Sequence, residues 1–250
     1  MLTEKRHEII LELLQKRRTI TVAEFKDELG ISESTIRRDL NALDKDGKLT
    51  KVFGGAVVMD AVPSAKELSV SQKLQVNERE KRNIAKYAAS LIQANDFIYL
   101  DAGTTTGYML EYPIEKNVTF VTNAVAHARR LAVAGYRVIL VGGELRGTTE
   151  AVVGAQAILA LQDYHFTIGF FGTNGISRRY GCSTPDGSEA LVKKTALRQC
   201  SKMFVLADAS KFDEVSSVTF AGYHEVQIIS ESIPVGYEKF ENIWLAGQDA

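Results

Sequence analysis

The chain has 250 residues, of which 45% are hydrophobic and 24% are charged, and its formal net charge at pH 7 is -1. This composition excludes a disordered chain and allows either one large domain or a small domain beside a medium-sized one. The net charge gives no sign of a nucleic-acid partner, so any such signal must lie in the placement of the basic residues.

Cysteine content and hydropathy point to an intracellular protein. Cys182 and Cys200 are too few for a disulfide framework or a metal-ligand cluster, so we expect reduced thiols and neither a metal nor another cofactor. The charged N-terminus, 1–8, has no apolar run after it, which argues against a signal peptide. No apolar segment approaches the roughly 20 residues that span a bilayer. We therefore expect a cytoplasmic protein with no membrane partner.

The first 57 residues predict three helices followed by a β-hairpin. The first helix carries an apolar stripe at helical spacing within 2–14. Thr21 and Glu24 have the spacing of a capping box, which predicts a second helix over 22–29. A third helix is expected over 33–46, after a tight turn, which gives the helix-turn-helix arrangement.

The third helix has a polar outer face. Ile36, Leu40 and Leu43 form its buried stripe, and at about 100° per residue the opposite face carries hydroxyl, amide and guanidinium groups that can bond to base edges. The following hairpin, 48–57, would form a wing whose lysines reach phosphates. The DNA-binding candidates are Ser32, Ser34, Thr35, Arg37, Arg38, Asn41, Lys45, Lys48 and Lys51. On the residues alone, a three-helix domain that binds protein remains the alternative.

Between residues 58 and 76 the hydrophobic pattern weakens, and Pro63-Ser64-Ala65 breaks regular structure. We interpret this segment as a hinge or a short helix that links two domains. Asn77 and Glu80 again have capping-box spacing, which predicts the start of a helix whose buried face includes Ile84 and Ala88.

From Asp96 onward, short apolar runs alternate with helical stretches, the pattern of a mainly parallel sheet covered on both faces. The expected strands are 97–100, 118–121, 137–141, 166–171, 202–206, 226–229 and 243–245, and the expected helices are 124–134, 149–161 and 188–199. The fold class is therefore α/β. We predict a winged helix-turn-helix domain over 1–57, a linker over 58–76 and an α/β domain over 77–250.

Five of the expected strands end in loops rich in glycine, hydroxyl, amide or charged side chains. Ligands bind at the carboxyl ends of the strands in such sheets. Gly103 and the threonines after it could cradle an anion, and Arg146 offers a bidentate donor. Each feature alone is more often a turn or a solvated residue, but together they fit a small polyhydroxylated anion. The effector-binding candidates are Asp101, Gly103, Thr104, Thr105, Thr106, Thr122, Asn123, Gly142, Gly143, Arg146, Asn174, Gly175, Glu189, Lys193, Asp208 and Lys211.

Both halves of the chain resemble the DeoR family of bacterial regulators. The N-terminal motif is Ser32-x-x-Thr35-Ile36-Arg37-Arg38-Asp39-Leu40-x-x-Leu43-x-x-x-Gly47, followed by Gly54-Gly55-Ala56. The C-terminal motifs are Asp101-x-Gly103-Thr104-Thr105, Thr122-Asn123, Gly142-Gly143-x-x-Arg146, Gly172-x-Asn174-Gly175-Ile176, Glu189-Ala190-x-Val192-Lys193 and Asp208-x-Ser210-Lys211-Phe212. The C-terminal half is similar to that family's sensor domain, whose fold resembles ribose-5-phosphate isomerase. Asp39 lies at the edge of the buried stripe, where we expect an ion pair or a cap inside the small domain.

The resemblance implies a transcriptional repressor of a sugar-utilisation operon that binds a double-stranded DNA operator as a homodimer or homotetramer and is relieved by a phosphorylated sugar. Overall similarity to fructose-operon repressors favours fructose-1-phosphate, and a tagatose-6-phosphate-responsive lactose-type repressor is the alternative. A sugar-phosphate isomerase is the rival from another class. It would need a carboxylate base, and the loop 172–175 carries an amide instead, although Glu189 or Asp101 could substitute. We expect a sensor with no catalytic residues.

Overall fold

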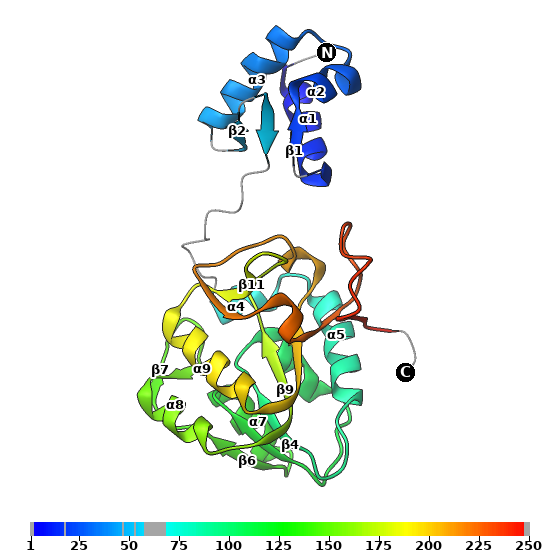
Figure 1. Cartoon of the computed structure of the whole chain (residues 1–250). Coiled ribbons are helices and arrows are strands. Elements are labelled where there is room, and N and C mark those ends of the chain that lie inside the picture. Colours follow the sequence, from blue (N-terminus) through cyan, green and yellow to red (C-terminus); the bar gives the residue numbers. More distant parts are fainter. Residues whose placement is uncertain (1–2, 18, 47, 53, 58–68, 248–250) are drawn as a thin grey trace. The chain divides into compact units, whose positions relative to one another are not determined.

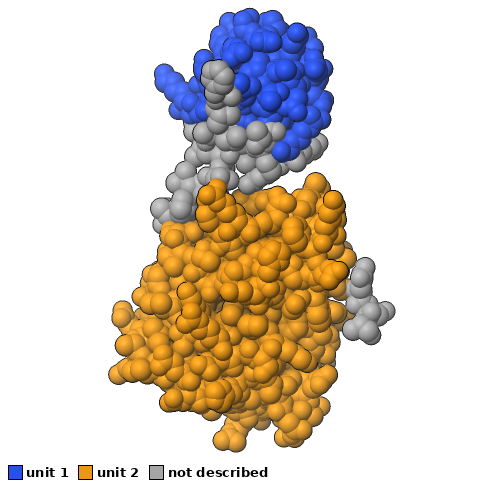
Figure 2. Space-filling view, viewed as in Figure 1, with its two compact units in different colours: residues 1–62 blue, residues 63–250 orange. Residues whose placement is uncertain are grey.

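The computed structural model describes residues 3–17, 19–46, 48–52, 54–57 and 69–247. Backbone contacts divide the chain into two compact units, residues 1–62 and residues 63–250 (Figure 2). Of the expected linker, residues 58–68 lie outside the described residues, as do Gly47 and Phe53. Residues 69–76 belong to the larger unit, in which Val70–Leu74 form helix α4.

The smaller unit contains three helices and a three-stranded antiparallel sheet. The helices are α1 (Thr3–Arg17), α2 (Val22–Leu29) and α3 (Glu33–Lys45), and the strands are β1 (Thr19–Thr21), β2 (Thr50–Val52) and β3 (Gly55–Val57), in the order β1-β3-β2. The capping box predicted before the second helix is confirmed, because the Thr21 hydroxyl accepts from the Glu24 amide and the Glu24 carboxylate accepts from the Thr21 amide. Gly30 ends that helix at φ 63°.

The larger unit is built on a seven-stranded, entirely parallel sheet (Figure 1). Its strands are β4 (Phe97–Leu100), β5 (Thr119–Thr122), β6 (Arg137–Leu140), β9 (Phe166–Gly172), β12 (Cys200–Leu206), β14 (Gln227–Ser230) and β15 (Ile243–Leu245). They lie in the order β15-β14-β12-β9-β4-β5-β6. All seven strands predicted from apolar runs are present, which confirms the α/β class.

Alternate side chains of the strands point to two separate cores. Tyr99 belongs to the core under α8 (Ala155–Gln162) and α9 (Gly187–Arg198), whereas its neighbours Ile98 and Leu100 belong to the core under α5 (Glu78–Ser90) and α7 (Val125–Val133). Burial on both faces explains why these strands are apolar throughout. The larger unit is therefore a three-layer α/β/α domain.

Short elements complete the larger unit. They are α6 (Thr104–Tyr108), the 3-10 turns η1 (Met109–Glu111), η2 (Ala209–Lys211) and η3 (Tyr223–Glu225), the hairpin β7 (Glu144–Leu145) and β8 (Val152–Val153), and the small sheet of β10 (Gly175–Ser177), β11 (Gly181–Thr184) and β13 (Val218–Ala221). The prediction of a helix from residue 149 was wrong at its start, because Val152 and Val153 pair with β7 and the helix follows Gly154 at φ 97°.

The predicted capping box at Asn77 was also wrong. Asn77 precedes α5 in the left-handed conformation, at φ 51°, and its side chain does not cap the helix. Its amide nitrogen donates instead to Asp208 Oδ1, at 2.8 Å, and to Ser210 Oγ, at 3.2 Å. A tertiary contact therefore replaces the local one.

Candidate functional site

The third helix presents the polar face that its sequence predicts. Ile36, Leu40 and Leu43 are fully buried in the core of the smaller unit. Ser32 caps the helix, because its hydroxyl accepts from the Thr35 amide at 3.4 Å. The DNA-binding candidates are exposed, apart from the half-buried Thr35: Ser32, Ser34, Arg37, Arg38, Asn41, Lys45, Lys48 and Lys51. The arrangement leaves guanidinium, amide and hydroxyl donors available to a major groove.

A buried ion pair fixes the third helix against the first. Asp39 is 2% exposed and Arg6 is 7% exposed, and Arg6 Nη2 donates to Asp39 Oδ1 at 2.9 Å. His7 Nε2 lies 3.3 Å from the same oxygen. Burial by itself would raise the pKa of Asp39, but Arg6 and then His7 outweigh it and hold that pKa below its usual value. The ion pair expected for Asp39 is confirmed.

The hairpin of β2 and β3 is fixed beside the third helix. Lys51 N donates to Asp44 Oδ1 at 2.8 Å, which ties β2 to the last turn of α3. Gly55 has no room for a side chain, since a Cβ there would lie 2.3 Å from the Ile20 carbonyl oxygen in β1. Gly54 turns the hairpin at φ 84°. Helix and hairpin therefore lie side by side, with Arg37, Arg38, Lys45 and Lys51 exposed on them, which is the winged helix-turn-helix geometry.

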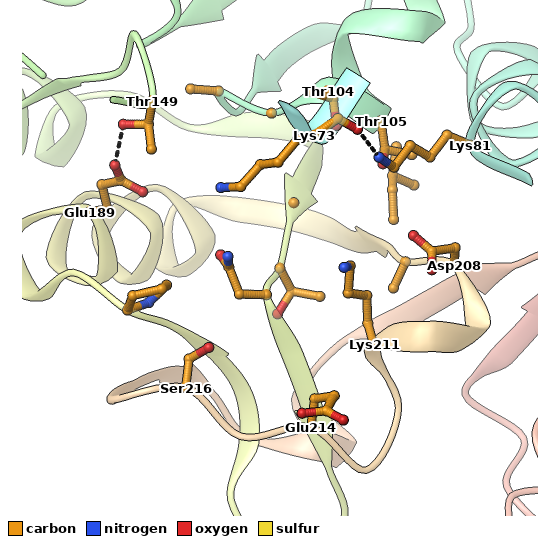
Figure 3. A pocket seen from close by; sticks show the side chains of 18 of the residues that line it. Lys73, Lys81, Thr104, Thr105, Thr149, Glu189, Asp208, Lys211, Glu214 and Ser216 are labelled. Atoms are coloured by element: carbon orange, nitrogen blue, oxygen red, sulfur yellow. Dashed lines mark hydrogen bonds between the residues drawn. The ribbon is translucent and has the colours of Figure 1, made fainter. Parts of the chain in front are cut away.

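A cavity of about 310 Å³ opens at the carboxyl edge of the parallel sheet (Figure 3). Loops that follow β4, β9 and β12 line it, and these strands are neighbours in the sheet. The chain runs outward from β4 through β5 and β6, and then from β9 through β12 in the other direction. The cavity thus lies at the point where the winding reverses, the place where open α/β sheets bind ligands.

Four lysines line the cavity: Lys73, Lys81, Lys193 and Lys211. Figure 3 shows Lys73 and Lys211 directed into it from two opposite walls. Lys81 is 4% exposed and its Nζ donates to the Lys73 carbonyl oxygen. Burial lowers the pKa of Lys81, Asp208 opposes that shift, and the charges of Lys211 and Lys73 add to it. An anion in the cavity would relieve this concentration of positive charge.

The charge of Lys193 is balanced by a buried carboxylate that does not line the cavity. Asp101, which is 1% exposed, forms an ion pair with Lys193 and accepts the Gly172 amide at 2.9 Å. Lys193 Nζ also donates to the Gly172 carbonyl oxygen at 3.1 Å. The pair joins α9 to the ends of β4 and β9. Asp101 therefore positions a lysine of the cavity and does not itself line it.

Carboxylates supply hydrogen-bond acceptors on other walls. Glu189 accepts a hydrogen bond from the Thr149 hydroxyl (Figure 3). Arg146 Nε lies 3.3 Å from Glu189 Oε1. Asp208, which is 2% exposed, accepts hydrogen bonds from the Asn77 side-chain amide and the Ser210 backbone amide. Lysines beside carboxylates and hydroxyls can bind an anionic group and several sugar hydroxyls together.

The structure brings together part of the predicted effector site. The candidates that line the cavity are Gly103, Thr104, Thr105, Asn174, Glu189, Lys193, Asp208 and Lys211, and those that do not line it are Asp101, Thr106, Thr122, Asn123, Gly142, Gly143, Arg146 and Gly175. The prediction assumed that five loops converge. Strand order separates them, because β5 lies beyond β4 and β6 is at the edge of the sheet.

Several of the outlying candidates support the loop after β4. The Thr106 hydroxyl donates to the Asp101 carbonyl oxygen at 2.8 Å, and Asn123 Oδ1 accepts the Ala102 amide at 3.0 Å. Thr122 donates its hydroxyl to the Leu100 carbonyl oxygen at 2.6 Å. Arg146 pairs with Asp186 as well as Glu189. These side chains therefore form hydrogen bonds or ion pairs within the protein.

Two of the glycine candidates are needed for close packing. A Cβ at Gly143 would lie 2.4 Å from the Val153 carbonyl oxygen, within the β7–β8 hairpin. A Cβ at Gly175 would lie 2.4 Å from the Glu214 carbonyl oxygen. Gly175 thus lets β10 pass close to a loop that lines the cavity. Gly142 is exposed and outside the cavity.

Sequence reasoning missed Lys73, Lys81, Thr149 and Glu214, which also line the cavity. Ser210, another lining residue, was part of the family motif but not of the candidate list. A signal existed for Lys81, because it lies three and four residues before Ile84 and Ala85 and so falls on the buried stripe of its helix. Lys73 belongs to a segment interpreted as a linker, and no local pattern connects it to a strand end.

In the part of the chain that the structure describes, no group of three or more His, Cys, Asp or Glu residues could hold a metal ion. Among the same residues, no helix is long and apolar enough to cross a membrane.

A DNA-reading unit joined to a unit with a ligand-sized cavity defines a transcriptional regulator with a sensor domain. Residues 6–62 match the DeoR-like helix-turn-helix domain, and residues 76–232 match the DeoR C terminal sensor domain. The chain belongs to the DeoR family, as its motifs predict. The relatives to which it is similar are named as transcriptional regulators or repressors and not as enzymes.

The relatives extend over nearly the whole chain. The HTH-type transcriptional regulator FruR of Bacillus subtilis is 39% identical over 231 residues, which cover 92% of this chain and 91% of that protein. A putative aga operon transcriptional repressor of Escherichia coli is 32% identical, with 98% and 92% covered. A lactose phosphotransferase system repressor of Staphylococcus aureus is 32% identical, with 94% and 92% covered.

Solved structures show more distant likenesses. Ribose 5-phosphate isomerase A of Methanocaldococcus jannaschii aligns with a TM-score of 0.39 and 17% identity, over 54% of this chain and 55% of that one. The sorbitol operon regulator SorC of Klebsiella pneumoniae aligns with a TM-score of 0.40 and 13% identity, over 89% of this chain and 95% of that one.

Proposed function

We propose that the protein represses a sugar-utilisation operon and that a phosphorylated sugar, bound in the cavity of the larger unit, relieves the repression. The observation that carries this proposal is the gathering of Lys73, Lys81, Lys193 and Lys211 around one cavity at the carboxyl edge of the sheet. A phosphate dianion provides the charge that Lys73, Lys81 and Lys211 attract, whereas the charge of Lys193 is already balanced by Asp101.

The remaining lining suits the sugar part of such a ligand. Glu189 and Asp208 can accept hydrogen bonds from sugar hydroxyl groups, while Thr104, Thr105 and Asn174 can donate or accept hydrogen bonds. The cavity of about 310 Å³ lies at the lower end of the range for small-molecule sites, about 300–1,000 Å³. This size favours a single monosaccharide phosphate over a nucleotide.

We propose fructose-1-phosphate as the first effector to test. The overall similarity to fructose-operon repressors supports it, and the relative with 39% identity is named FruR. Tagatose-6-phosphate is the second candidate, because relatives with 32% identity are named lactose phosphotransferase system repressors.

We also propose that the operator is read by a homodimer or a homotetramer. Helix-turn-helix proteins place paired recognition helices in successive major grooves, so two copies of α3 would contact two half-sites. Arg38 and Asn41 would contact base edges, and Lys48 and Lys51 would contact phosphates. The effector would then favour an assembly whose recognition helices no longer match the operator.

The test joins ligand binding to DNA release. The purified full-length protein selects its operator from a genomic fragment library, and fluorescence anisotropy follows the complex. Fructose-1-phosphate, tagatose-6-phosphate, fructose and inorganic phosphate are compared by calorimetry. We expect a phosphorylated sugar to bind and to release the DNA, whereas fructose does neither.

A matched pair of variants locates the binding site. Lys211→Met should weaken binding of the phosphorylated sugar, and Lys86→Met, on the exposed face of α5, should leave it unchanged. Two results would contradict the proposal: no phosphorylated sugar binds, or the bound sugar is converted to its isomer in an NMR assay while the DNA complex persists.

A further inference from the structure

One wall of the cavity comes from the part of the larger unit that lies nearest, along the chain, to the DNA-binding unit. We name residues 69–77 the strap; they contain α4 and end at Asn77, just before α5. Val70 and Lys73 of the strap line the cavity, and Figure 3 shows the Lys73 side chain directed into it. The strap is therefore both a ligand wall and the start of the connection toward the recognition helix.

The strap is held by polar contacts and not by a core. None of the five residues of α4, all of which the structure describes, is buried, and Leu74 is 40% exposed. Val70 N donates to the Thr148 carbonyl oxygen at 3.3 Å, and the Tyr108 hydroxyl donates to the Leu74 carbonyl oxygen at 3.2 Å. Segments with few buried apolar contacts open at low free energy. Small changes at its anchors can therefore shift the strap between docked and undocked states.

Two of its anchors are residues of the cavity itself. Asp208 lines the cavity, and its Oδ1 accepts a hydrogen bond from the Asn77 side-chain amide at 2.8 Å. Lys81 also lines the cavity, and its ammonium group donates to the Lys73 carbonyl oxygen. An ammonium group has three N–H donors, so Lys81 can hold this carbonyl and a ligand oxygen together. A ligand that contacts Asp208 or Lys81 thus touches a group that holds the strap.

Asn77 is unusual in a way that this role explains. It adopts the left-handed conformation at φ 51°, which asparagine tolerates better than most residues. Its side chain reaches Asp208 and Ser210 and leaves the first turn of α5 without a side-chain cap from this residue. The side chain of Asn77 thus docks the strap onto the loop after β12, while its backbone carbonyl oxygen accepts the Lys81 amide at 3.0 Å and starts α5.

We propose that the strap closes on the bound effector and reports its presence to the chain that leads to the DNA-binding unit, with Lys73 as a phosphate contact and Asn77 as the latch. This inference rests on the proposed function. A ligand that contacts Lys73 binds the docked strap more tightly than the undocked one, so it raises the docked population by its differential affinity.

Hydrogen–deuterium exchange on the full-length protein tests the strap directly. The probes are fructose-1-phosphate, tagatose-6-phosphate and inorganic phosphate, each at a concentration that calorimetry shows to be saturating. We expect the probe that binds to slow amide exchange in residues 69–77.

Variants separate the latch from the phosphate contact. Asn77→Gly keeps the left-handed backbone accessible and removes both side-chain hydrogen bonds. It should speed exchange in the strap without ligand and raise the ligand concentration needed for DNA release. Asn77→Asp, which places a carboxylate against Asp208, should act in the same direction. Asn83→Ala, on an exposed position of α5, is the control and should change neither quantity.

Lys73→Met tests the contact from the strap. Loss of a hydrogen bond to a charged group should weaken effector binding about tenfold or more, while Lys86→Met leaves it unchanged. If a phosphorylated sugar binds and releases DNA but exchange in the strap does not change, the strap inference is overturned and the proposed function stands. If no phosphorylated compound binds the wild-type protein, both are overturned.

Discussion

The buried ion pair behind the cavity gives a prediction whose size follows from the structure. Asp101 is 1% exposed and Lys193 is 5% exposed, and they pair at the ends of β4 and β9. Asp101→Asn keeps an oxygen that can accept the Gly172 amide, now bonded at 2.9 Å, but replaces the other oxygen with an NH2 group and removes the negative charge. Lys193 would then keep its hydrogen bond to the Gly172 carbonyl oxygen but lose its charge partner.

Removing one partner of a buried ion pair typically costs about 3–5 kcal/mol, because the other charge remains buried. For a domain of this size, each kcal/mol lowers the melting temperature by about 2–4 °C, so Asp101→Asn should lower it by about 6–20 °C. The double variant Asp101→Asn, Lys193→Met removes both charges. Its melting temperature should fall by much less than the sum of the decreases in the two single variants.

Tryptophan fluorescence isolates the unfolding of the larger unit, because Trp244 in β15 is the one tryptophan of the chain. Thermal unfolding of the wild type, both single variants and the double variant completes a double-mutant cycle. A melting temperature of Asp101→Asn within about 2 °C of the wild type, or losses in the double variant equal to the sum, would refute the reasoning. Either result would mean that the two charges are not energetically coupled.

Three further predictions concern DNA binding, pH and ligand charge. Arg38→Ala should weaken operator binding by about 1–3 kcal/mol at fixed salt while calorimetry shows unchanged effector binding; equal operator affinity would exclude a base contact. Asp39→Asn should destabilise the smaller unit near neutral pH. Because the folded pKa of Asp39 lies below its usual value, the stability it contributes is present above about pH 4 and lost as the pH falls through the folded pKa. The gap between wild type and variant, followed by circular dichroism, should therefore close in acid, and a gap that persists would contradict the ion-pair account. Lys81→Met should weaken effector binding in calorimetry, and the strength of that binding in the wild type should fall as added salt screens the lysines; a response independent of salt would argue against an anionic ligand.

Local chemistry determined much of the secondary structure. The second helix begins and ends where its capping box and Gly30 predict, because these signals act through backbone groups within four residues. The outer face of α3 follows from helical periodicity in the same way. Asn77 shows the limit of this reasoning, because a capping-box pattern gave way to a contact with a residue far along the chain.

The sequence by itself determined the seven strands of the large sheet, most of the longer helices and the polar strand ends, since these depend on short-range hydrogen bonding and on the period of apolar residues. Only the tertiary structure decided which strand ends meet. By placing β9 between β4 and β12, it brought Gly103, Asn174 and Asp208 to one cavity and left Thr122 and Gly142 outside. The order of parallel strands is set by long-range packing of sheet and helices, so no local pattern could assign Lys73 and Lys81 to the cavity or Arg146 to its ion pairs.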